Sequence, residues 1–419
     1  MKNTTQSNPK NNSQNSSLRA LGWSILLFPI CLVLFEFTVY IGNDMTQPAM
    51  PKHILPFFNA GEEWNTKSMS YYIIGGMILQ WIIGPLADRK GRRLVMLSGV
   101  LFFMIMCLVI LLANSIEQFM AIRLLQGIGL CFIGAVGYAA IQDSFSETIA
   151  IKLTAIMANV SLIAPMLGPL MGSEMIKYVP WQMIFVLFAG LSLIAFAGLF
   201  KSMPESAPLK DNPLVVKEIY RDYVQVLTNP QFLRGALAIG FAVIPLLTWI
   251  AQTPMIFMEH RNFSNEAYSL LQIPVFVSLL CGNFTLTKLT GKVAVTRPIF
   301  LGAFPMLLGV LIAVLGLLFI PDAFEFMVIG VSIYAYGLGV ANAGLYRLTL
   351  FSSHVSKGTV SAGLGMINAI MFAIGIEIAN VVYLKMDLFG FNLISFICIF
   401  AWCYFAYRFI LIHKKSKGL

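Results

Sequence analysis

Two carboxyl groups, Glu36 and Asp44, lie inside an apolar stretch near the start of the chain, LFEFTVYIGNDMTQP at residues 34–48. An ionised side chain at the centre of a bilayer costs about 2.5 to 3.5 kcal/mol on insertion scales, so an acid retained there indicates a function. On a helix, Glu36, Tyr40 and Asp44 project from one face, with the two acids about 12 Å apart along the axis. This distance is too long for one shared proton. The spacing therefore predicts two separate sites that take up and release protons in a membrane.

Two further charges fall in apolar segments. Arg123 begins RLLQGIGLCFIGAVGYAAIQDS, and an unpaired cation in a membrane costs as much as an acid, so we expect a carboxylate or a substrate beside it. A purely structural ion pair is the alternative interpretation. Glu377, in FAIGIEIAN, lies about two turns from the predicted outer end of its helix. It either reaches the membrane interface or takes part in coupling, and the interface is favoured.

The composition indicates which elements hold these charges. Of 419 residues, 58% are hydrophobic and 11% are charged, whereas soluble domains have about 25% charged residues. Apolar segments of about 20 residues, long enough to cross a membrane as helices, recur along the chain. They predict an all-α polytopic membrane protein with twelve transmembrane helices. The predicted spans are 21–47, 68–87, 94–114, 118–142, 150–174, 181–200, 232–258, 267–290, 297–320, 323–350, 358–384 and 389–412.

The net charge of +9 could indicate a nucleic-acid partner, so the positions of the basic residues matter. If both termini are cytoplasmic, 22 of the 28 basic residues fall in inside segments and five fall in outside loops, with Arg123 left in a span. This asymmetry follows the positive-inside rule, so the basic residues report orientation and not nucleic-acid binding. Attraction to anionic lipid headgroups adds a minor contribution.

The longest polar segment, 201–231, divides the predicted spans into two sets of six. Its Pro/Ser-rich start and amphipathic continuation predict a cytoplasmic linker with a short surface helix. Two six-helix bundles around a central cavity are how many transporters achieve alternating access. The predicted organisation is a disordered cytoplasmic tail at 1–17, an N-terminal bundle at 18–200, the linker, a C-terminal bundle at 232–412 and a cytoplasmic tail at 413–419.

Other site chemistries find little support in the residue pattern. The six cysteines fall in predicted spans without CxxC spacing, and the four histidines are scattered through loops and the tail, so neither disulfides nor a metal site is expected. A membrane enzyme would need a nucleophile with its base, or metal ligands, and the chain shows no such set. The first residues lack the apolar core of a cleavable signal, so we expect the first helix to be retained.

Three segments carry a family resemblance. GPLADRKGRR at 84–93 resembles the loop signature of the major facilitator superfamily, and RLLQGIG and APMLGPLMG resemble the fourth- and fifth-helix elements of its twelve-helix drug/proton antiporters. FPICLVLFEFTVYIGNDMTQP, GGMILQWIIGPLADRKGRR, LCFIGAVGYAAIQDSF, SIYAYGLGVANAGLYRLTLF and SKGTVSAGLGM strengthen the resemblance, which covers about residues 24–385. The tails and the 205–220 segment fall outside it.

The resemblance implies roles for particular residues. The proton-coupling residues would be Glu36, Asp44 and Arg123, and the drug cavity would be lined by Tyr40, Asn43, Met69, Tyr138 and Met157 together with the two acids. The gating residues would be Asp88 and Arg92 of a cytoplasmic latch, Pro165, Gly168 and Pro169 of the fifth-helix element, and Arg347 near the inner end of the tenth helix. Asp143 stands where the family often has Glu, and Leu338 and Tyr346 lie in its variable second-half lining.

The resemblance implies a monomeric secondary transporter of a bacterial inner membrane that exports lipophilic cationic and neutral drugs in exchange for protons, without a cofactor. Access to water or a bound cationic drug can switch the protonation state of a buried carboxyl group, which would couple the two fluxes. An exporter dedicated to one metabolite, sugar or siderophore is the alternative, because such motifs report fold and coupling more than ligand. Uptake by symport is less favoured because of the fifth-helix element.

Overall fold

The computed structural model describes residues 10–145, 147–206, 216–290, 292–320, 322–353, 355 and 357–416, and within these ranges the regular structure is helical. The first half contains α1 (Lys10–Asp44), α2 (Leu55–Phe57), α3 (Lys67–Ile78), α4 (Gln80–Lys90), α5 (Arg92–Val109), α6 (Ile116–Gly127), α7 (Gly129–Phe132), α8 (Tyr138–Ser144), α9 (Glu147–Met175) and α10 (Gln182–Ser202). The second half contains α12 (Pro230–Thr253), α13 (Asn265–Leu289), α14 (Thr296–Phe319), α15 (Phe324–Leu350) and α16 (Lys357–Ser416), after the linker helix α11 (Val216–Leu227). Short turns include η1 (Met50–Ile54), η4 (Ile133–Gly137) and η5 (Pro254–His260).

The helices account for the predicted spans one by one. In the described ranges, nine helices are long and apolar enough to cross a membrane, and the bent pair formed by α3 and α4 supplies a tenth span. The longest of the nine, Thr359–Ile412, contains a break at Asp387 (φ 51°, ψ −145°), so it comprises the two spans predicted on either side of 385–388. The remaining predicted span, 150–174, lies within α9. The all-α, twelve-helix fold class is confirmed.

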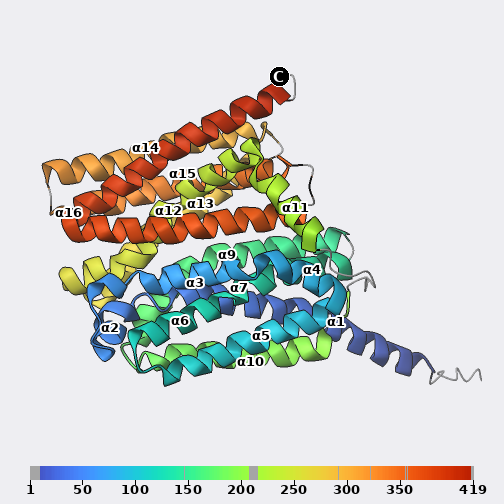
Figure 1. The fold of residues 1–419 in the computed structure, drawn as a ribbon. Helices are drawn as coiled ribbons and strands as arrows, with labels where there is room; N and C mark the ends of the chain where they lie inside the picture. Colours follow the sequence, from blue (N-terminus) through green and yellow to red (C-terminus); the bar gives the residue numbers. More distant parts are fainter. Residues whose placement is uncertain are drawn as a thin grey trace, which may run out of the picture.

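The two halves lie side by side, with their helices running back and forth between two ends (Figure 1). The start of α1 and the C-terminus lie at one end, here called the terminal end. The opposite end carries α2 and the α14–α15 connection and is here called the α2 end. Helices α9 and α3 of the first half pack against α13 and α16 of the second half, and η1 packs against η5. These contacts place the interface between the halves along the middle of the molecule.

Small residues set the close helix crossings within each half. A Cβ atom added to Gly75 of α3 would lie 1.9 Å from the Leu124 carbonyl oxygen of α6, and one added to Gly309 of α14 would lie 2.3 Å from the Gly330 carbonyl oxygen of α15. Without a hydrophobic force between helices in lipid, such backbone approach is a main source of packing energy. The glycine content of the spans therefore has a structural purpose in both bundles.

Two boundaries differ from those expected. Helix α1 begins at Lys10, inside the segment assigned to a disordered tail, because extending an existing helix adds one hydrogen bond for each residue fixed and so tolerates polar Asn and Ser. At the other end of the chain, α16 continues to Ser416 into the segment assigned to the C-terminal tail. The amphipathic helix expected in the linker is α11, which packs against α16, while residues 207–215 of the linker lie outside the described residues.

Candidate functional site

A cavity of about 810 Å³ lies between the two halves. Its volume falls in the range of pockets that enclose drug-sized ligands. The first half contributes Tyr40, Asn43, Asp44, Tyr72, Gln80 and Tyr138, and the second half contributes Leu246, Asn283, Leu338, Asn342, Tyr346, Asn368 and Phe372, among other residues. Because both halves supply the wall, relative movement of the halves changes the cavity.

The structure places some of the residues predicted to line the cavity in its wall and others outside it. Tyr40, Asn43, Asp44 and Tyr138 line the cavity, as expected from the resemblance. Among the described residues, Glu36, Met69 and Met157 are outside its lining. Met69 and Met157 are fully buried in the hydrophobic core. In this structure they support the cavity wall without facing its interior.

Glu36 lies behind the cavity wall, where it contacts the lining residue Tyr138. Its side chain is fully buried, and Tyr138 Oη donates a hydrogen bond of 2.9 Å to Glu36 Oε1. Glu36 Oε2 is buried and has no hydrogen-bond partner among the residues the structure describes. A buried oxygen without a partner is a place where a proton or a ligand donor is accommodated favourably. Tyr138 lines the cavity, so it connects this carboxyl group to the cavity wall.

Asp44 ends α1 and lines the cavity directly, although its side chain is 3% exposed. Asn43 Nδ2 donates a hydrogen bond of 2.9 Å to Asp44 Oδ1. Helix α9 passes so close that a Cβ atom added to Gly168 would lie 2.6 Å from the Asp44 Cβ atom, and one added to Gly172 would lie 2.2 Å from the Met45 carbonyl oxygen. The glycines of the fifth-span element thus fix the position of the acid. Pro165 and Pro169 lie on the same helix.

Arg123 donates hydrogen bonds to backbone oxygens, where the sequence predicted a carboxylate or a substrate. Its Nη1 donates to the Gly42 carbonyl oxygen at 3.1 Å and its Nη2 donates to the Asn43 carbonyl oxygen at 3.4 Å. The guanidinium also donates to Ser68 Oγ and Gln126 Oε1 and lies 4.5 Å above the Tyr72 ring. The final carbonyls of a helix lack intrahelical partners and carry negative partial charge, so they can solvate a buried cation. Arg123 therefore neutralises the end of α1 next to Asp44.

The predicted cytoplasmic latch lies at the terminal end of the first half. Arg92 forms ion pairs with Asp88, at 3.1 Å between Nη2 and Oδ1, and with Asp143 at the end of α8. Gly91 supplies the backbone turn with φ of 99°, a region that suits glycine. Glu205 accepts hydrogen bonds from the Arg92 and Arg93 backbone N–H groups at the start of α5, at 2.8 and 3.3 Å. Glu205 was missed by the sequence reasoning because it lies 113 and 112 residues from the two N–H groups that it caps.

The second half supplies amides that the sequence reasoning also missed. Asn283, Asn342 and Asn368 line the cavity, and each has a buried side-chain atom without a hydrogen-bond partner among the described residues. Polar residues inside predicted spans were the available signal, because a polar group in a membrane faces the bundle interior. Arg347, predicted as a gating residue, is exposed near the end of α15, and its neighbour Tyr346 lines the cavity.

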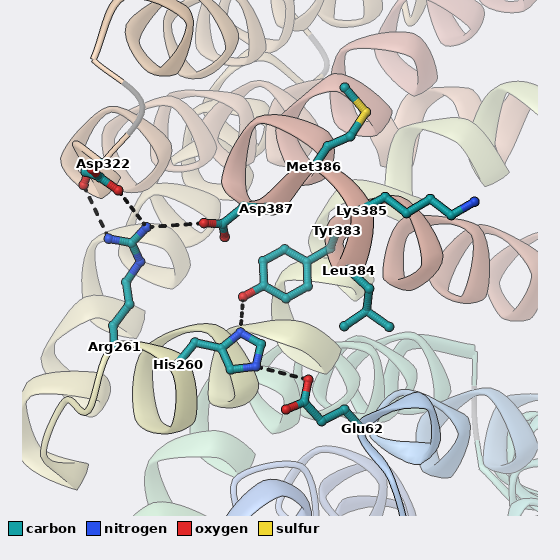
Figure 2. Close-up of a pocket in the computed structure, with 9 residues that line it drawn as sticks. All are labelled: Glu62, His260, Arg261, Asp322, Tyr383, Leu384, Lys385, Met386 and Asp387. Atoms are coloured by element: carbon teal, nitrogen blue, oxygen red, sulfur yellow. Dashed lines mark hydrogen bonds and ion pairs between the residues drawn. The ribbon is translucent and has the colours of Figure 1, made fainter.

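Polar contacts join the two halves at the α2 end and form what we call the seam. Figure 2 shows His260 of the second half between Tyr383 of the second half and Glu62 of the first half, with its Nδ1 2.5 Å from Tyr383 Oη and its Nε2 3.1 Å from Glu62 Oε2. These residues line a second cavity of about 580 Å³. Nearby, Asn65 Nδ2 of the first half donates 3.2 Å to the Ala251 carbonyl oxygen.

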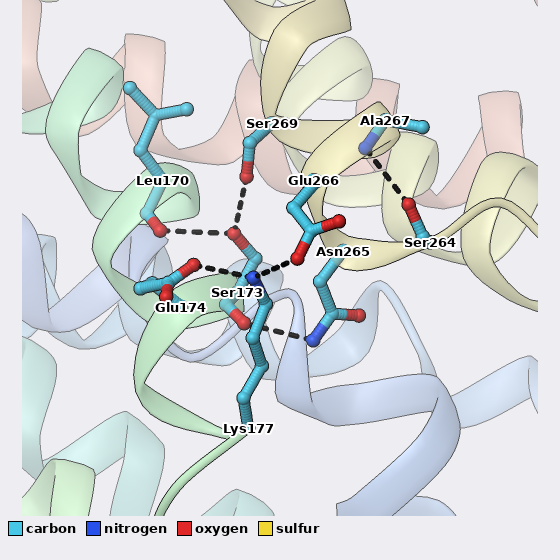
Figure 3. Close-up of polar contacts among 9 residues, drawn as sticks. All are labelled: Leu170, Ser173, Glu174, Lys177, Ser264, Asn265, Glu266, Ala267 and Ser269. Carbon is cyan, nitrogen blue, oxygen red and sulfur yellow. Dashed lines mark hydrogen bonds and ion pairs between the residues drawn. The ribbon is translucent and has the colours of Figure 1, made fainter.

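A second part of the seam joins α9 to α13 (Figure 3). Ser173 and Ser269 are 2.7 Å apart between hydroxyl oxygens, and Asn265 Nδ2 donates 3.0 Å to the Ser173 carbonyl oxygen. Lys177 Nζ, after the end of α9, donates to Glu174 at 2.6 Å and to Glu266 of the second half at 3.0 Å. These two hydrogen bonds raise the pKa of Lys177, and the bond to Glu174 has the larger effect. The seam closes this end of the cavity in the present structure.

Comparison with known proteins shows which family the chain resembles. The model of the Major Facilitator Superfamily matches residues 32–379. The chain is 56% identical over 382 residues to the multidrug transporter MdfA of Yersinia pestis bv. Antiqua (strain Angola), covering 91% of this chain and 93% of that relative. It is 53% identical over 387 residues to the multidrug transporter MdfA of Edwardsiella piscicida, covering 92% and 94%.

Solved structures support the fold alone. A crystal structure of a D-xylose-proton symporter has a TM-score of 0.69 at 16% identity, and the match covers 91% of this chain and 97% of that one. A central cavity between two six-helix halves, the GPLADRKGRR loop between the second and third spans and a family model that covers most of the sequence all agree. The chain therefore belongs to the major facilitator superfamily.

Proposed function

We propose that the protein exports chemically diverse lipophilic cationic and neutral drugs across a bacterial inner membrane in exchange for protons. The observation that carries this proposal is an acid, Asp44, in the wall of a largely apolar cavity shared by the two halves. Relatives at 56% and 53% identity are named multidrug transporters, which supports a broad substrate range. The protein would act as a monomer, with both termini in the cytoplasm and the α2 end outside.

The cavity geometry supports competition between drug and proton. A cationic drug in the cavity would interact with the ionised Asp44 carboxylate, whereas a proton on the same group would remove that attraction. Ligands that compete for one site are linked reciprocally, so drug release favours proton binding and proton release favours drug binding. Alternating exposure of the cavity then ties drug export to proton entry.

Glu36 and Arg123 would extend this coupling beyond the cavity wall. Tyr138 bonds to Glu36 and lines the cavity, so a bound drug that displaces the Tyr138 hydroxyl changes the environment of the Glu36 carboxyl group. Arg123 holds the last turn of α1 through the Gly42 and Asn43 carbonyls, so movement of α1 alters the field at Asp44. Two acids would let the protein handle cationic and neutral substrates by neutralising one or the other.

The latch and the fifth-span element would control the movement. Asp88 and Arg92 tie the α4–α5 turn to the end of α8, so breaking these ion pairs would free the terminal end of the first half. Gly168 lets α9 pack directly against Asp44, so a shift of α9 would move the acid. Because the seam closes the α2 end, we propose that this structure is the form in which the cavity faces the cytoplasm. Arg347 lies at that side of the second half.

An exporter dedicated to one polar metabolite remains the second candidate. The unpartnered amide atoms of Asn283, Asn342 and Asn368 favour it, since a site built to hydrogen-bond one ligand strongly rejects molecules that lack the matching groups. The same amides can bind neutral drugs that carry hydroxyl or amide groups. The two candidates therefore differ in the number of unrelated compounds that move protons.

Reconstitution in liposomes distinguishes the candidates. The purified protein would be inserted into vesicles with an internal pH probe, and proton movement would be followed after adding lipophilic cations, neutral drugs or single metabolites. Many unrelated drugs should move protons, and Asp44→Asn should abolish the response to cations. Glu36→Gln should alter the response in a substrate-dependent manner, while Glu325→Gln, at an exposed acid of α15, serves as the control. A response to a single metabolite would instead establish the dedicated exporter.

A further inference from the structure

Glu377 of α16 is an acid of the second half that lies outside the cavity lining among the described residues. Its Oε1 accepts a hydrogen bond of 2.6 Å from Ser70 Oγ and one of 3.1 Å from Thr66 Oγ1, both in the first half. The two donors are buried, with exposed fractions of 2% for Ser70 and 0% for Thr66. The sequence favoured a carboxyl group that extends to the membrane interface. In the structure, this group instead accepts hydrogen bonds across the seam.

The two side chains that donate hydrogen bonds to Glu377 are uncharged. Gln252 of α12 donates its side-chain N–H to the Ile376 carbonyl oxygen at 3.5 Å. Lys67 of α3 is the cation that acts on Glu377, and its Nζ lies 3.8 Å from the centre of the Trp64 ring. Titratable groups elsewhere in the seam include Glu62, Glu174 and Lys177 on the first half and His260, Glu266 and Tyr383 on the second half. Arg261, Asp322, Lys385 and Asp387 of the second half line the same second cavity.

Opening of the α2 end must separate Glu377 from Ser70 and Thr66, because the acid and its donors belong to different halves. Hydroxyl groups bond to an ionised carboxylate about twice as strongly as to a neutral carboxyl group. A proton on Glu377 therefore weakens the two contacts that hold this part of the seam. Conversely, opening the seam removes the donors that favour the ionised form.

We propose that Glu377 is a proton-released latch of the α2-end gate: its carboxylate holds α16 to α3 in the closed form, and protonation from the outside favours the open form. The proposal rests on the alternating-access function proposed above and deepens it. Glu377 is a positioning residue, since it acts on the gate and makes no contact with the drug cavity. Protons would then act at two places: on the cavity acids to displace drug, and on Glu377 to open the gate on the proton-rich side.

The experiment measures gate opening without transport. The full-length protein would carry spin labels at Leu112→Cys and Phe319→Cys, two highly exposed positions at the α2 end, one in each half. Cys281 and Cys403, the cysteines that are exposed or partly exposed, would be replaced by Ser, leaving the buried ones unlabelled. The label-to-label distance distribution in lipid nanodiscs would be recorded between about pH 8 and about pH 5.5, which gives the populations of the closed and open forms.

In the parent protein, the open population should rise about threefold as the pH falls, because the proton and the open form are linked. Glu377→Gln should show a raised open population at both pH values, with the acid-induced rise reduced to less than about half. Ser70→Ala removes the shorter hydrogen bond, so it should also raise the open population at about pH 8 while Glu377 still titrates. The matched control Glu325→Gln, at an exposed acid of the same half and the same end, should behave as the parent.

An unchanged pH response in Glu377→Gln would overturn the proposal for Glu377. A Ser70→Ala variant that stays as closed as the parent would also overturn it. The liposome assay separates this failure from failure of the proposed function. If drugs still move protons in vesicles while Glu377→Gln opens like the parent, the latch alone is wrong. If drugs move no protons in the parent protein, the antiport proposal is wrong, whatever the label distances show.

Discussion

Arg123 donates a hydrogen bond of 3.1 Å to the carbonyl oxygen of Gly42, two residues before Asp44. The buried guanidinium thus stabilises the end of the helix that carries the cavity acid, and no carboxylate of the described residues lies within ion-pair distance of it. A buried cation satisfied by helix-terminal carbonyls can change its partners without creating an uncompensated acid. This relationship gives Arg123 a part in the packing of α1, and the proposed antiport adds a part in coupling.

Replacement of Arg123 should therefore affect stability and transport together. Arg123→Met removes the charged donor of the Gly42 and Asn43 carbonyls, which keep only the Thr46 hydroxyl and the Gln47 amide as side-chain donors. It should cost about 1.5 to 3 kcal/mol of stability, with loss of drug-driven proton movement. Arg123→Lys keeps the charge but has one donor group in place of a planar fork, so it should retain partial activity. Thermal unfolding and the vesicle pH assay measure both effects. A fully active, fully stable Arg123→Met protein would contradict the assignment.

Tyr138→Phe removes the hydroxyl that bonds to Glu36 Oε1, so this oxygen would lack its hydrogen-bond donor as Oε2 already does among the described residues. Loss of one hydrogen bond to a charged group should change its protonation free energy by about 1.5 to 3 kcal/mol, so the pH optimum of transport should shift by about one to two units. Tyr346→Phe is the control, because the Tyr346 hydroxyl also lines the cavity but bonds to Ser361. An identical pH profile in wild type and Tyr138→Phe would show that Glu36 does not titrate during transport.

Gly168→Ala should be strongly harmful although it adds a single methyl group. The added Cβ atom would lie 2.6 Å from the Asp44 Cβ atom and 3.0 Å from the Met45 backbone nitrogen, so α9 must move away from α1. Overpacking of this kind costs about 1 to 3 kcal/mol and would displace the acid in the cavity wall. Gly190→Ala on α10, where nothing lies within 4 Å of the added atom, should leave drug affinity unchanged. Equal drug affinity in the two variants would argue against the positioning role of Gly168.

The Lys177 contact predicts a stability change at high pH. Because the raised pKa of Lys177 lies above its unfolded value, the stabilisation is fully present below about pH 10.5 and is lost as the pH rises through the folded pKa. Wild type should therefore lose thermal stability between about pH 10 and about pH 12, and Lys177→Arg should lose less because its guanidinium stays charged. Lys177→Met should lack this component. If all three proteins lose stability equally over this range, the contact with Glu174 and Glu266 contributes nothing.

Much of the fold could be predicted from composition and from the periodic return of apolar segments. A segment of about 20 apolar residues has few places to go except across a bilayer, and a helix satisfies its own backbone there, so span number and type follow from local sequence. The intramembrane acids Glu36 and Asp44 and the cation Arg123 stood out for the same reason, since a charge in such a segment needs an explanation. The loop signature at 84–93 predicted Asp88 and Arg92 as gating residues, and the structure pairs these two side chains.

The partners of those charges depended on tertiary structure. Helix rotation and helix crossing decide which groups meet, and hydropathy does not encode either of them. They bring Arg123 to the α1 carbonyls and Tyr138 to Glu36. They also bury Met69 and Met157 in the hydrophobic core. Glu377 was visible as an intramembrane acid, yet its donors Ser70 and Thr66 lie more than 300 residues away. Sequence alone determined that this protein keeps charges inside a membrane, because the free-energy cost of each is local. Tertiary structure decided which groups contact those charges, because that depends on how the helices and the two halves pack together.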